Sequence, residues 1–412
     1  MNISFSHKFL AFSLYVMAVF PLLPKKILGL PVILLIISSF INFILTKKSS
    51  FNYKKLLIGI IPFILFLISA FYSDDLSSAF KKVSGTRLSL LVVPLAFFLM
   101  NKSTLKYLKS KFYKFQIAFS ISSLLLCIFY FSYLPFIEAS QNPHFAFPSG
   151  FFFKAATEKI PYFHLEPVYF SFLIVISLIN SVSLYVQKHI NLFHFIIFGI
   201  FYLSVILLMT SKLAILFAML FSVWSVFFIL KNKIFKVALI IVMLFSLYPL
   251  TQIPSIKYEI EEVQYFLEGK KRAKDDSTQK RYRITISSLD LAKEINLLIG
   301  TGIGDVQKEL NNVYKLNKYK ELLVKKFDSH NQYLSMFLGT GLIGLIGLII
   351  HLAILIKVAI KKKFIFGFWV ISFIIIQMLT ETVLERQVPV IIYSLSISLI
   401  LFFPKKCSDE IK

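Results

Sequence analysis

Cysteine is scarce in this chain of 412 residues, which contains only Cys127 and Cys407. One lies within an apolar run and the other near the end of the sequence, so they support neither a disulfide framework nor a cysteine-based metal site. Acidic residues are also few, 21 against 45 lysines and arginines, and the net charge is +24. This excess does not indicate nucleic-acid binding, because the lysines form short clusters between apolar runs and not one basic face.

Charged residues are largely missing from the middle of the apolar runs. A transporter or flippase would place charged groups near the centre of its helices, and the inverted repeats that many transporters have are not recognisable here. Alternating segments of about ten residues, the pattern of a transmembrane β-barrel, are absent too. The first apolar run, 9–23, has no A-x-A-like cleavage site, so we expect a retained helix and not a signal peptide.

Long hydrophobic runs are abundant, and 57% of all residues are hydrophobic. The runs are about 17–25 residues long, enough for a helix to cross a hydrocarbon layer of about 30 Å. The sequence therefore predicts an all-α polytopic membrane protein with about 12 transmembrane helices. We expect these helices over residues 8–23, 27–46, 56–72, 88–100, 113–137, 165–186, 190–209, 213–230, 237–250, 331–357, 364–380 and 387–403.

The chain then divides into three segments: helices 1–9 in residues 1–250, a large polar loop over 251–329, and helices 10–12 with the C-terminal tail in 330–412. Most lysine clusters fall on one side of this arrangement, so the positive-inside rule favours both termini in the cytoplasm. The loop is then outside, and it is too long to be an idle connection. It is expected to be partly helical, because apolar residues in 282–298 recur at helical spacing.

Polar and ionisable groups gather on the outer side of the predicted topology, where such groups are functional candidates by default. The principal ones are His164, Lys212, Arg281, Arg283, the glycine string 300–304, His330 and Glu381. Several also have a plain structural explanation, as an interfacial histidine, a snorkelling lysine, solvated helix charges or a tight turn. His330 resists such an explanation most, because it stands beside Asn331 where the polar loop meets a long apolar helix.

These residue types suit a particular reaction. Arginine and lysine can hold a diphosphate, and the planar fork of arginine gives paired hydrogen bonds to it. A histidine can take a proton from a hydroxyl near neutral pH. Together they suit attack by an alcohol on a carbon whose leaving group is a diphosphate. No carboxylate cluster demands a metal, and outside the membrane a lipid-linked donor is a better expectation than a nucleotide sugar.

Over 281–347 the sequence resembles the bacterial O-antigen ligase and O-antigen polymerase superfamily. Arg283 followed by the glycine segment 297–306 is similar to the arginine and Gly-x-Gly motif of the family's large periplasmic loop. His-Asn-Gln-Tyr-Leu at 330–334, with the glycine-containing helix after it, is similar to a second family motif. The last outside turn, 380–387, resembles that of one branch of the family. About 12 helices with both termini inside also fit.

The resemblance implies metal-independent glycosyl transfer, without a cofactor, from an undecaprenyl-diphosphate-linked glycan at the periplasmic face of the bacterial inner membrane. By position, His330 matches the family histidine that activates the acceptor hydroxyl. Arg283, or the nearby Arg281, matches the diphosphate-binding arginine. Lys212 falls where many members have arginine, and it keeps the charge without the fork. His164 and Glu381 are expected as supporting residues.

Several functions stay open. A ligase passes the glycan to lipid A-core, a polymerase passes it to another lipid-linked glycan, and a third member class passes it to protein hydroxyls. We favour the ligase as the common function of this architecture. A lipid-linked glycan flippase or other transporter, and a structural membrane protein, are alternatives from other classes. Besides donor and acceptor, the expected partners are membrane lipids, with no nucleic acid.

Overall fold

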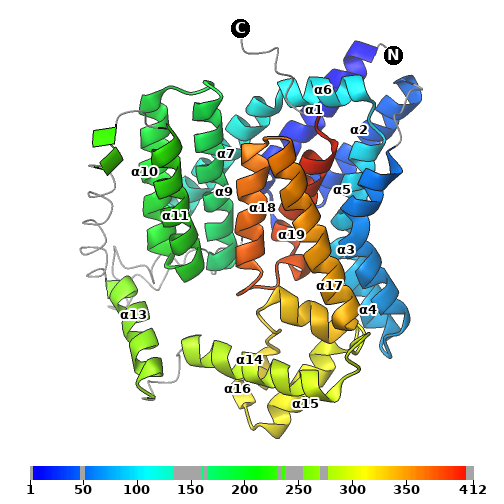
Figure 1. The fold of residues 1–412 in the computed structure, drawn as a ribbon, viewed down its shortest axis with the longest axis vertical. Coiled ribbons are helices and arrows are strands. Elements are labelled where there is room, and N and C mark those ends of the chain that lie inside the picture. The colour runs from blue at the N-terminus through cyan, green and yellow to red at the C-terminus, as the bar shows by residue number, and fades with distance from the viewer. Residues whose placement is uncertain are drawn as a thin grey trace. The chain divides into compact units, whose positions relative to one another are not determined.

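The computed structural model describes residues 3–46, 52–133, 157, 160, 163, 165–229, 233–234, 236–237, 254–269 and 277–404. In this part of the chain every regular element is a helix and there is no strand (Figure 1). Eight of these helices are long and apolar enough to cross a membrane, or up to nine if a bent pair counts as one span. The described part of the chain is therefore all-α, with eight to nine candidate membrane spans.

This count is lower than the predicted number of spans, and three of the predicted spans that account for the difference lie in the described chain. Thr86–Phe98 and Lys102–Ser110 form a pair bent by 107° and not one straight span. Two apolar helices near the C-terminal end, α18 (Ile365–Gln377) and α19 (Gln387–Phe402), have 13 and 16 residues. At 1.5 Å per residue they extend about 20 and 24 Å, less than a hydrocarbon core of about 30 Å. Most of the helix expected over 237–250 lies outside the described residues.

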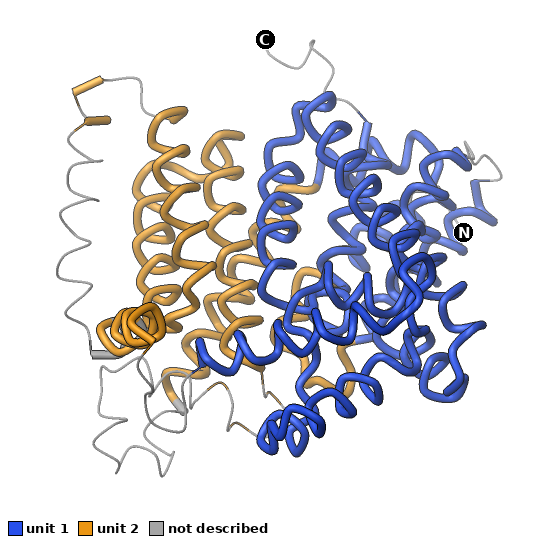
Figure 2. Tube along the Cα trace, turned by 60° about the horizontal axis from the view of Figure 1, so that its bottom comes forward, with its two compact units in different colours: residues 1–14, 29–111, 277–412 blue, residues 15–28, 112–276 orange. Residues whose placement is uncertain are grey.

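One compact unit comprises residues 15–28 and 112–276 (Figure 2). It contains the end of α1 (Ile3–Val19), η1 (Phe20–Leu22), η2 (Lys25–Ile27), α7 (Phe112–Tyr133), α9 (Pro167–Val186), α10 (Leu192–Met209), α11 (Lys212–Ile229) and α13 (Pro254–Leu267). α9 is buried along almost its whole length. Polar contacts join α7 to α9, because Gln116 of α7 donates hydrogen bonds to Asn180 and Ser183 of α9.

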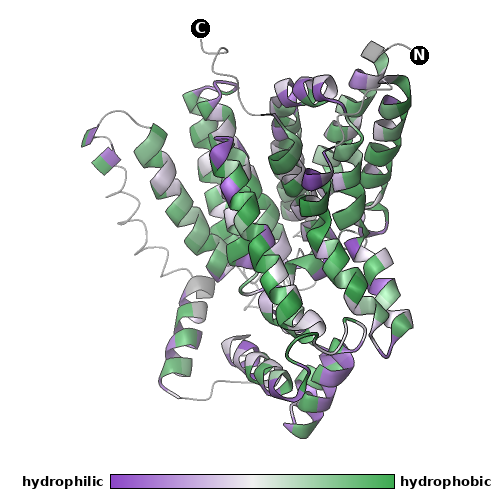
Figure 3. Cartoon of the chain, turned by 45° about the vertical axis from the view of Figure 1, so that its right-hand side comes forward, coloured by the Kyte–Doolittle hydropathy of each residue, from purple (hydrophilic) through white to green (hydrophobic). Residues whose placement is uncertain are grey.

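The other compact unit comprises residues 1–14, 29–111 and 277–412. Its elements are the start of α1, α2 (Leu30–Thr46), α3 (Tyr53–Phe71), α4 (Leu76–Ser84), η3 (Thr86–Leu88), α5 (Ser89–Phe98), α6 (Lys102–Ser110), α14 (Ser277–Glu294), α15 (Val306–Leu316), α16 (Lys320–Lys325), α17 (Gln332–Lys361), α18, η7 (Val383–Glu385) and α19. The loop helices α14, α15 and α16 carry far more hydrophilic residues than the spans (Figure 3).

The loop helices share one apolar core with the first part of α17. Ile284 and Leu291 of α14 pack with Leu310 and Tyr314 of α15, and with Leu338 of α17. The predicted helix over 282–298 is present, but it begins earlier and ends at Glu294. This core fixes one face of α14 against the start of α17.

α17 is broken at Gly341, whose φ of 63° is not helical. The break leaves backbone groups of α17 without partners in the helix, and the segment 297–302 supplies hydrogen-bond partners for them. Leu342 N–H donates to the carbonyl of Leu297, and Thr301 N–H donates to that of Leu338, each at 2.8 Å. The segment that joins α14 to α15 is therefore bonded directly into the broken span.

Glycine is required where the two backbones meet. A Cβ atom at Gly341 would stand 2.2 Å from the carbonyl carbon of Leu298, and one at Gly300 would stand 2.5 Å from the carbonyl oxygen of Leu338. The glycine string, which the sequence predicted as a tight turn after a helix, thus also serves close backbone approach. It holds the loop helices in a fixed register against α17.

Candidate functional site

His330 is positioned by the residues that start α17. The Asn331 side chain caps the helix by accepting from the N–H groups of Tyr333 and Leu334, at 2.9 and 3.0 Å. His330 itself has a left-handed φ of 44°. Its N–H donates to Oδ1 of Asp328 at 2.9 Å, a local bond that favours such a turn. The imidazole therefore stands at the helix N-terminus on a defined turn.

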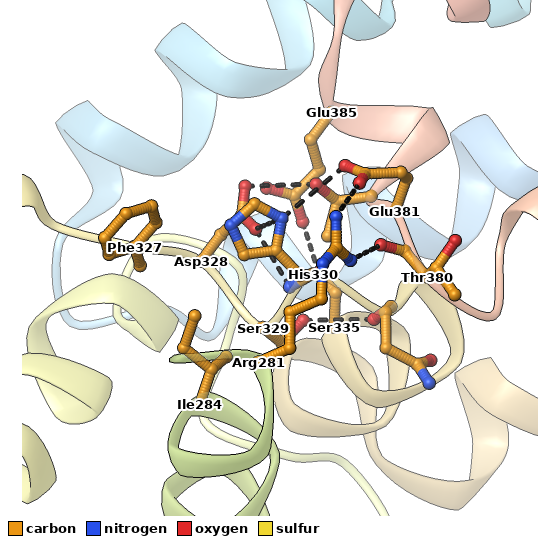
Figure 4. Close-up of polar contacts among 12 residues, drawn as sticks. Arg281, Ile284, Phe327, Asp328, Ser329, His330, Ser335, Thr380, Glu381 and Glu385 are labelled. Atoms are coloured by element: carbon orange, nitrogen blue, oxygen red, sulfur yellow. Dashed lines mark hydrogen bonds and ion pairs between the residues drawn. The ribbon is translucent and has the colours of Figure 1, made fainter. Parts of the chain in front are cut away.

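Two carboxylates face the same nitrogen of this imidazole. Nδ1 of His330 lies 3.5 Å from Oε2 of Glu381 and 3.7 Å from Oδ1 of Asp328 (Figure 4). The Glu381 side chain is only 3% exposed and that of His330 17% exposed. Because Nδ1 is directed to the carboxylates, Nε2 is the nitrogen that remains for a ligand.

Arginines complete this group on both sides. Arg281 of α14 donates through Nη2 to Oε1 of Glu381 and through Nη1 to the carbonyl of Thr380, both at 2.6 Å (Figure 4). Arg386 donates to Oδ2 of Asp328 at 3.2 Å. We call these five residues the His330 cluster: Arg281, Asp328, His330, Glu381 and Arg386. Their charges alternate, so that each carboxylate has a cation beside it.

The environment shifts the pKa values of the central pair. Burial alone would lower the pKa of His330, but the contact with Glu381 and the charges of Asp328 and Glu381 outweigh it, and the pKa is raised. Burial alone would raise the pKa of Glu381, but His330 and Arg281 outweigh it, and the pKa is lowered. Glu381 is therefore an anion at neutral pH, and the pKa of His330 is raised above its ordinary value.

The two neighbouring arginines of α14 have different surroundings. Arg281 belongs to the His330 cluster, whereas the guanidinium of Arg283 lies 5.4 Å from the centre of the Tyr319 ring. Residues two apart on a helix point about 200° apart, so only one of the two can face the cluster. The structure brings Arg281, and not Arg283, next to His330.

Lys212 and His164 are the remaining predicted site residues. Lys212 begins α11 in the other compact unit and pairs with Glu262 of α13 at 3.2 Å. Glu262 is buried, and Lys212 is half exposed. His164 lies outside the described residues.

A second polar group was missed by sequence reasoning. Arg87, at the turn before α5, is 3% exposed and lies 3.4 Å from Oε1 of Glu385. Ser335 of α17 donates to the same carboxylate oxygen. The guanidinium also lies 4.2 Å from the centre of the Phe66 ring. Nothing local in the sequence reveals that Arg87 is buried beside a carboxylate that is distant along the chain.

Chemically, the His330 cluster offers a base and a set of hydrogen-bond donors for an anion. In the part of the chain that the structure describes, no three His, Cys, Asp or Glu side chains are arranged to hold a metal ion. A neutral imidazole oriented by carboxylates can accept a proton from a hydroxyl. An arginine beside it can stabilise negative charge on a departing group.

Residues 197–349 match the family described as O-Antigen ligase, so this part of the chain is an O-antigen ligase family domain. The family covers O-antigen ligases and polymerases, which are glycosyltransferases, and it implies lipid-linked glycan substrates. The matched region contains Lys212, Arg281, Arg283 and His330, and it ends before Glu381. No curated protein matches the chain.

Proposed function

We propose that this protein, with its O-antigen ligase family domain, transfers a glycan from an undecaprenyl-diphosphate carrier to an acceptor hydroxyl. The observation that carries the proposal is the His330 cluster, in which a base and an arginine meet around the same buried carboxylate. The cluster unites residues from α14, the start of α17 and the turn before α19. The family match, which includes His330 and Arg281, points to the same chemistry.

In this proposal His330 is the general base. Nε2 takes the proton of the acceptor hydroxyl while its oxygen forms a bond to the anomeric carbon of the donor sugar. The bond from that carbon to the diphosphate oxygen breaks, and the carrier diphosphate leaves with the electron pair. Glu381 and Asp328 fix the orientation of the ring and stabilise the imidazolium that forms, as a carboxylate does for a catalytic histidine.

Arg281 is our choice for the residue that binds the leaving diphosphate. Its side chain is 42% exposed, so donors remain available although Glu381 and Thr380 accept two hydrogen bonds. Glu381 thus orients both the base and the diphosphate ligand. Arg283 and Lys212 are the alternative diphosphate ligands that the sequence predicts.

The acceptor that we favour is lipid A-core, which makes the protein an O-antigen ligase of the bacterial inner membrane acting at the periplasmic face. A polymerase of the same family uses the same chemistry with a lipid-linked glycan as acceptor. Protein hydroxyls are a third acceptor class. Transport of a lipid-linked glycan is less well supported, because the polar groups gather at helix ends and loops.

The test is the surface glycan of a strain that lacks the protein, with extraction of the lipid-linked pool. Loss of glycan from lipid A-core with long chains on the carrier means ligase. A single repeat unit on lipid A-core means polymerase. Complementation with His330→Gln, at a protein level equal to that of the wild type, must reproduce the deletion. A fully active His330→Gln variant contradicts the mechanism.

A further inference from the structure

A small, open cavity lies beside the His330 cluster. Its walls come from α3, α4, η3, α15, the start of α17 and η7, all within one compact unit. The polar residues that concern us are Lys82, Arg87, Asp328, Ser329 and Glu385. Of the residues used in the proposed mechanism, Asp328 lines the cavity, whereas His330 and Arg281 do not.

The cations of this cavity have more donors than they use. Nε and Nη1 of Arg87 are buried, and no residue that the structure describes accepts a hydrogen bond from either nitrogen. Lys82 donates to the carbonyl of Ile303 at 2.8 Å, and an ammonium has three donors. Buried donors without acceptors are costly and rare. Arg87 in particular offers two buried donors to an acceptor oxygen that enters the cavity.

The carboxylates of the cavity are already compensated. Glu385 accepts from Ser335 and faces Nη2 of Arg87. Asp328 accepts from the N–H of His330, the Thr382 hydroxyl and Arg386. Burial lowers the pKa of Lys82, and the nearby Glu385, Asp305 and Asp75 oppose this shift. The surplus in the cavity is therefore one of hydrogen-bond donors.

We infer that this cavity is an oxyanion site, in which Arg87 and Lys82 bind a phosphate or carboxylate group of a substrate. The site is separate from the arginine that we assign to the leaving diphosphate. Asp328 and Ser329, the two residues before His330, form part of its wall, so a group bound here lies beside the base. As a substrate subsite the inference rests on the proposed function, whereas anion binding itself does not.

The direct test is binding of inorganic phosphate and pyrophosphate to the purified full-length protein, followed by calorimetry and by thermal shift. We expect Lys82→Gln and Arg87→Lys to weaken binding about 10- to 100-fold, as for loss of a hydrogen bond between charged groups. Lys81→Gln, an exposed lysine one position away, is the matched control and should bind like the wild type.

Glu385→Gln gives a result of the opposite sign. It removes the negative charge that faces Arg87, so anion affinity should rise. Wild-type affinity in both Lys82→Gln and Arg87→Lys, or no phosphate binding by the wild type, overturns the inference. Lys82 is only partly buried, so its variant stays informative if Arg87→Lys does not fold.

Kinetics identify which substrate supplies the anion. If the group belongs to the acceptor, Lys82→Gln raises the KM for the acceptor and leaves that for the donor unchanged; if it is a donor phosphate, the reverse holds. Unchanged values for both substrates contradict a substrate subsite. Failure of the wild type to transfer glycan would instead refute the proposed function. The phosphate-binding measurements would still decide whether the cavity binds an anion.

Discussion

At the scale of single residues, His330 combines a raised pKa with an oriented ring. The protonated form is favoured in the folded protein because Glu381 and Asp328 stabilise it. This stabilisation is fully present below the pKa of the unfolded chain and is lost as the pH rises through the folded-state pKa. His330 must be neutral to act as a base. Proton transfer to it therefore improves as the pH rises through its folded-state pKa, the range in which the stabilisation by Glu381 and Asp328 is lost.

We therefore expect the rate of glycan transfer to rise with pH, with its midpoint above the ordinary histidine value of about 6.5. Glu381→Gln removes a charge that raises this pKa, so the rising limb should move to lower pH. The measurement is the pH dependence of transfer in isolated membranes. Glu294→Gln, which removes an exposed carboxylate at the end of α14, should leave the limb in place. An unmoved limb in Glu381→Gln contradicts the role of Glu381.

The two arginines of α14 should differ in their effect on activity. Arg281→Gln should lower transfer about 10- to 150-fold, because a hydrogen bond to a charged group contributes about 1.5–3 kcal/mol. Arg281→Lys, which keeps the charge, should be intermediate. Arg283→Gln should retain most activity, since Arg283 lies over Tyr319. Equal loss in Arg281→Gln and Arg283→Gln, at matched protein levels, would argue against the assignment.

The helix pattern could have indicated which arginine faces the cluster. Arg281, Ile284, Ser288 and Leu291 lie three, four and three residues apart, and the last three are buried. Residues at this spacing share a helix face. The sequence thus predicted His330, Arg281 and Glu381 by type, and their meeting around one carboxylate depends on contacts about 100 residues apart along the chain. Arg87 had no local signal, because its partner Glu385 is far away in the sequence.

At the scale of elements, the junction between α17 and the segment 297–302 should tolerate no side chain. Gly341→Ala would place a Cβ atom 2.2 Å from the backbone of Leu298 at a positive φ. A strained φ alone costs about 1–3 kcal/mol, and a backbone clash adds to it. We expect a clearly lower thermal stability in detergent and loss of activity.

The matched control is Gly199→Ala in α10, where no atom lies within 4 Å of the added methyl group. This helical position should accept alanine without loss, because alanine is the better helix former. Equal thermal stability of Gly341→Ala and Gly199→Ala would show that the close approach at the break is not needed.

Hydropathy predicts where helices occur in this chain, but not how they bend or break. It indicates apolar runs well, and α2, α3, α9, α10 and α11 occur where the sequence predicted helices. It does not report that a run bends, as at residues 99–101 between α5 and α6, or that a helix is too short to cross. Nor does hydropathy reveal the break at Gly341, because the run is apolar on both sides of it.

At the scale of the whole molecule, the lysine distribution predicts which side each end of α17 faces. The helix has 30 residues, enough to cross a bilayer completely. In a Cys407→Ser background, in which Cys127 is buried, Lys315→Cys in α15 should react with a membrane-impermeant maleimide in intact cells. Lys361→Cys, at the far end of α17, should react only after permeabilisation. The opposite pattern would reverse the topology and place the His330 cluster on the cytoplasmic side.

The break in α17 finally has a consequence for how the chain is made. Residues 297–302 are synthesised before α17. The segment that completes the hydrogen bonding of this span is therefore already made when the span is synthesised. Open backbone groups in lipid cost several kcal/mol each, and α17 reaches its final hydrogen bonding only when the earlier segment meets it. A chimera that takes the large loop from a relative must therefore take α17 from the same relative, because the backbone bonds join the two segments.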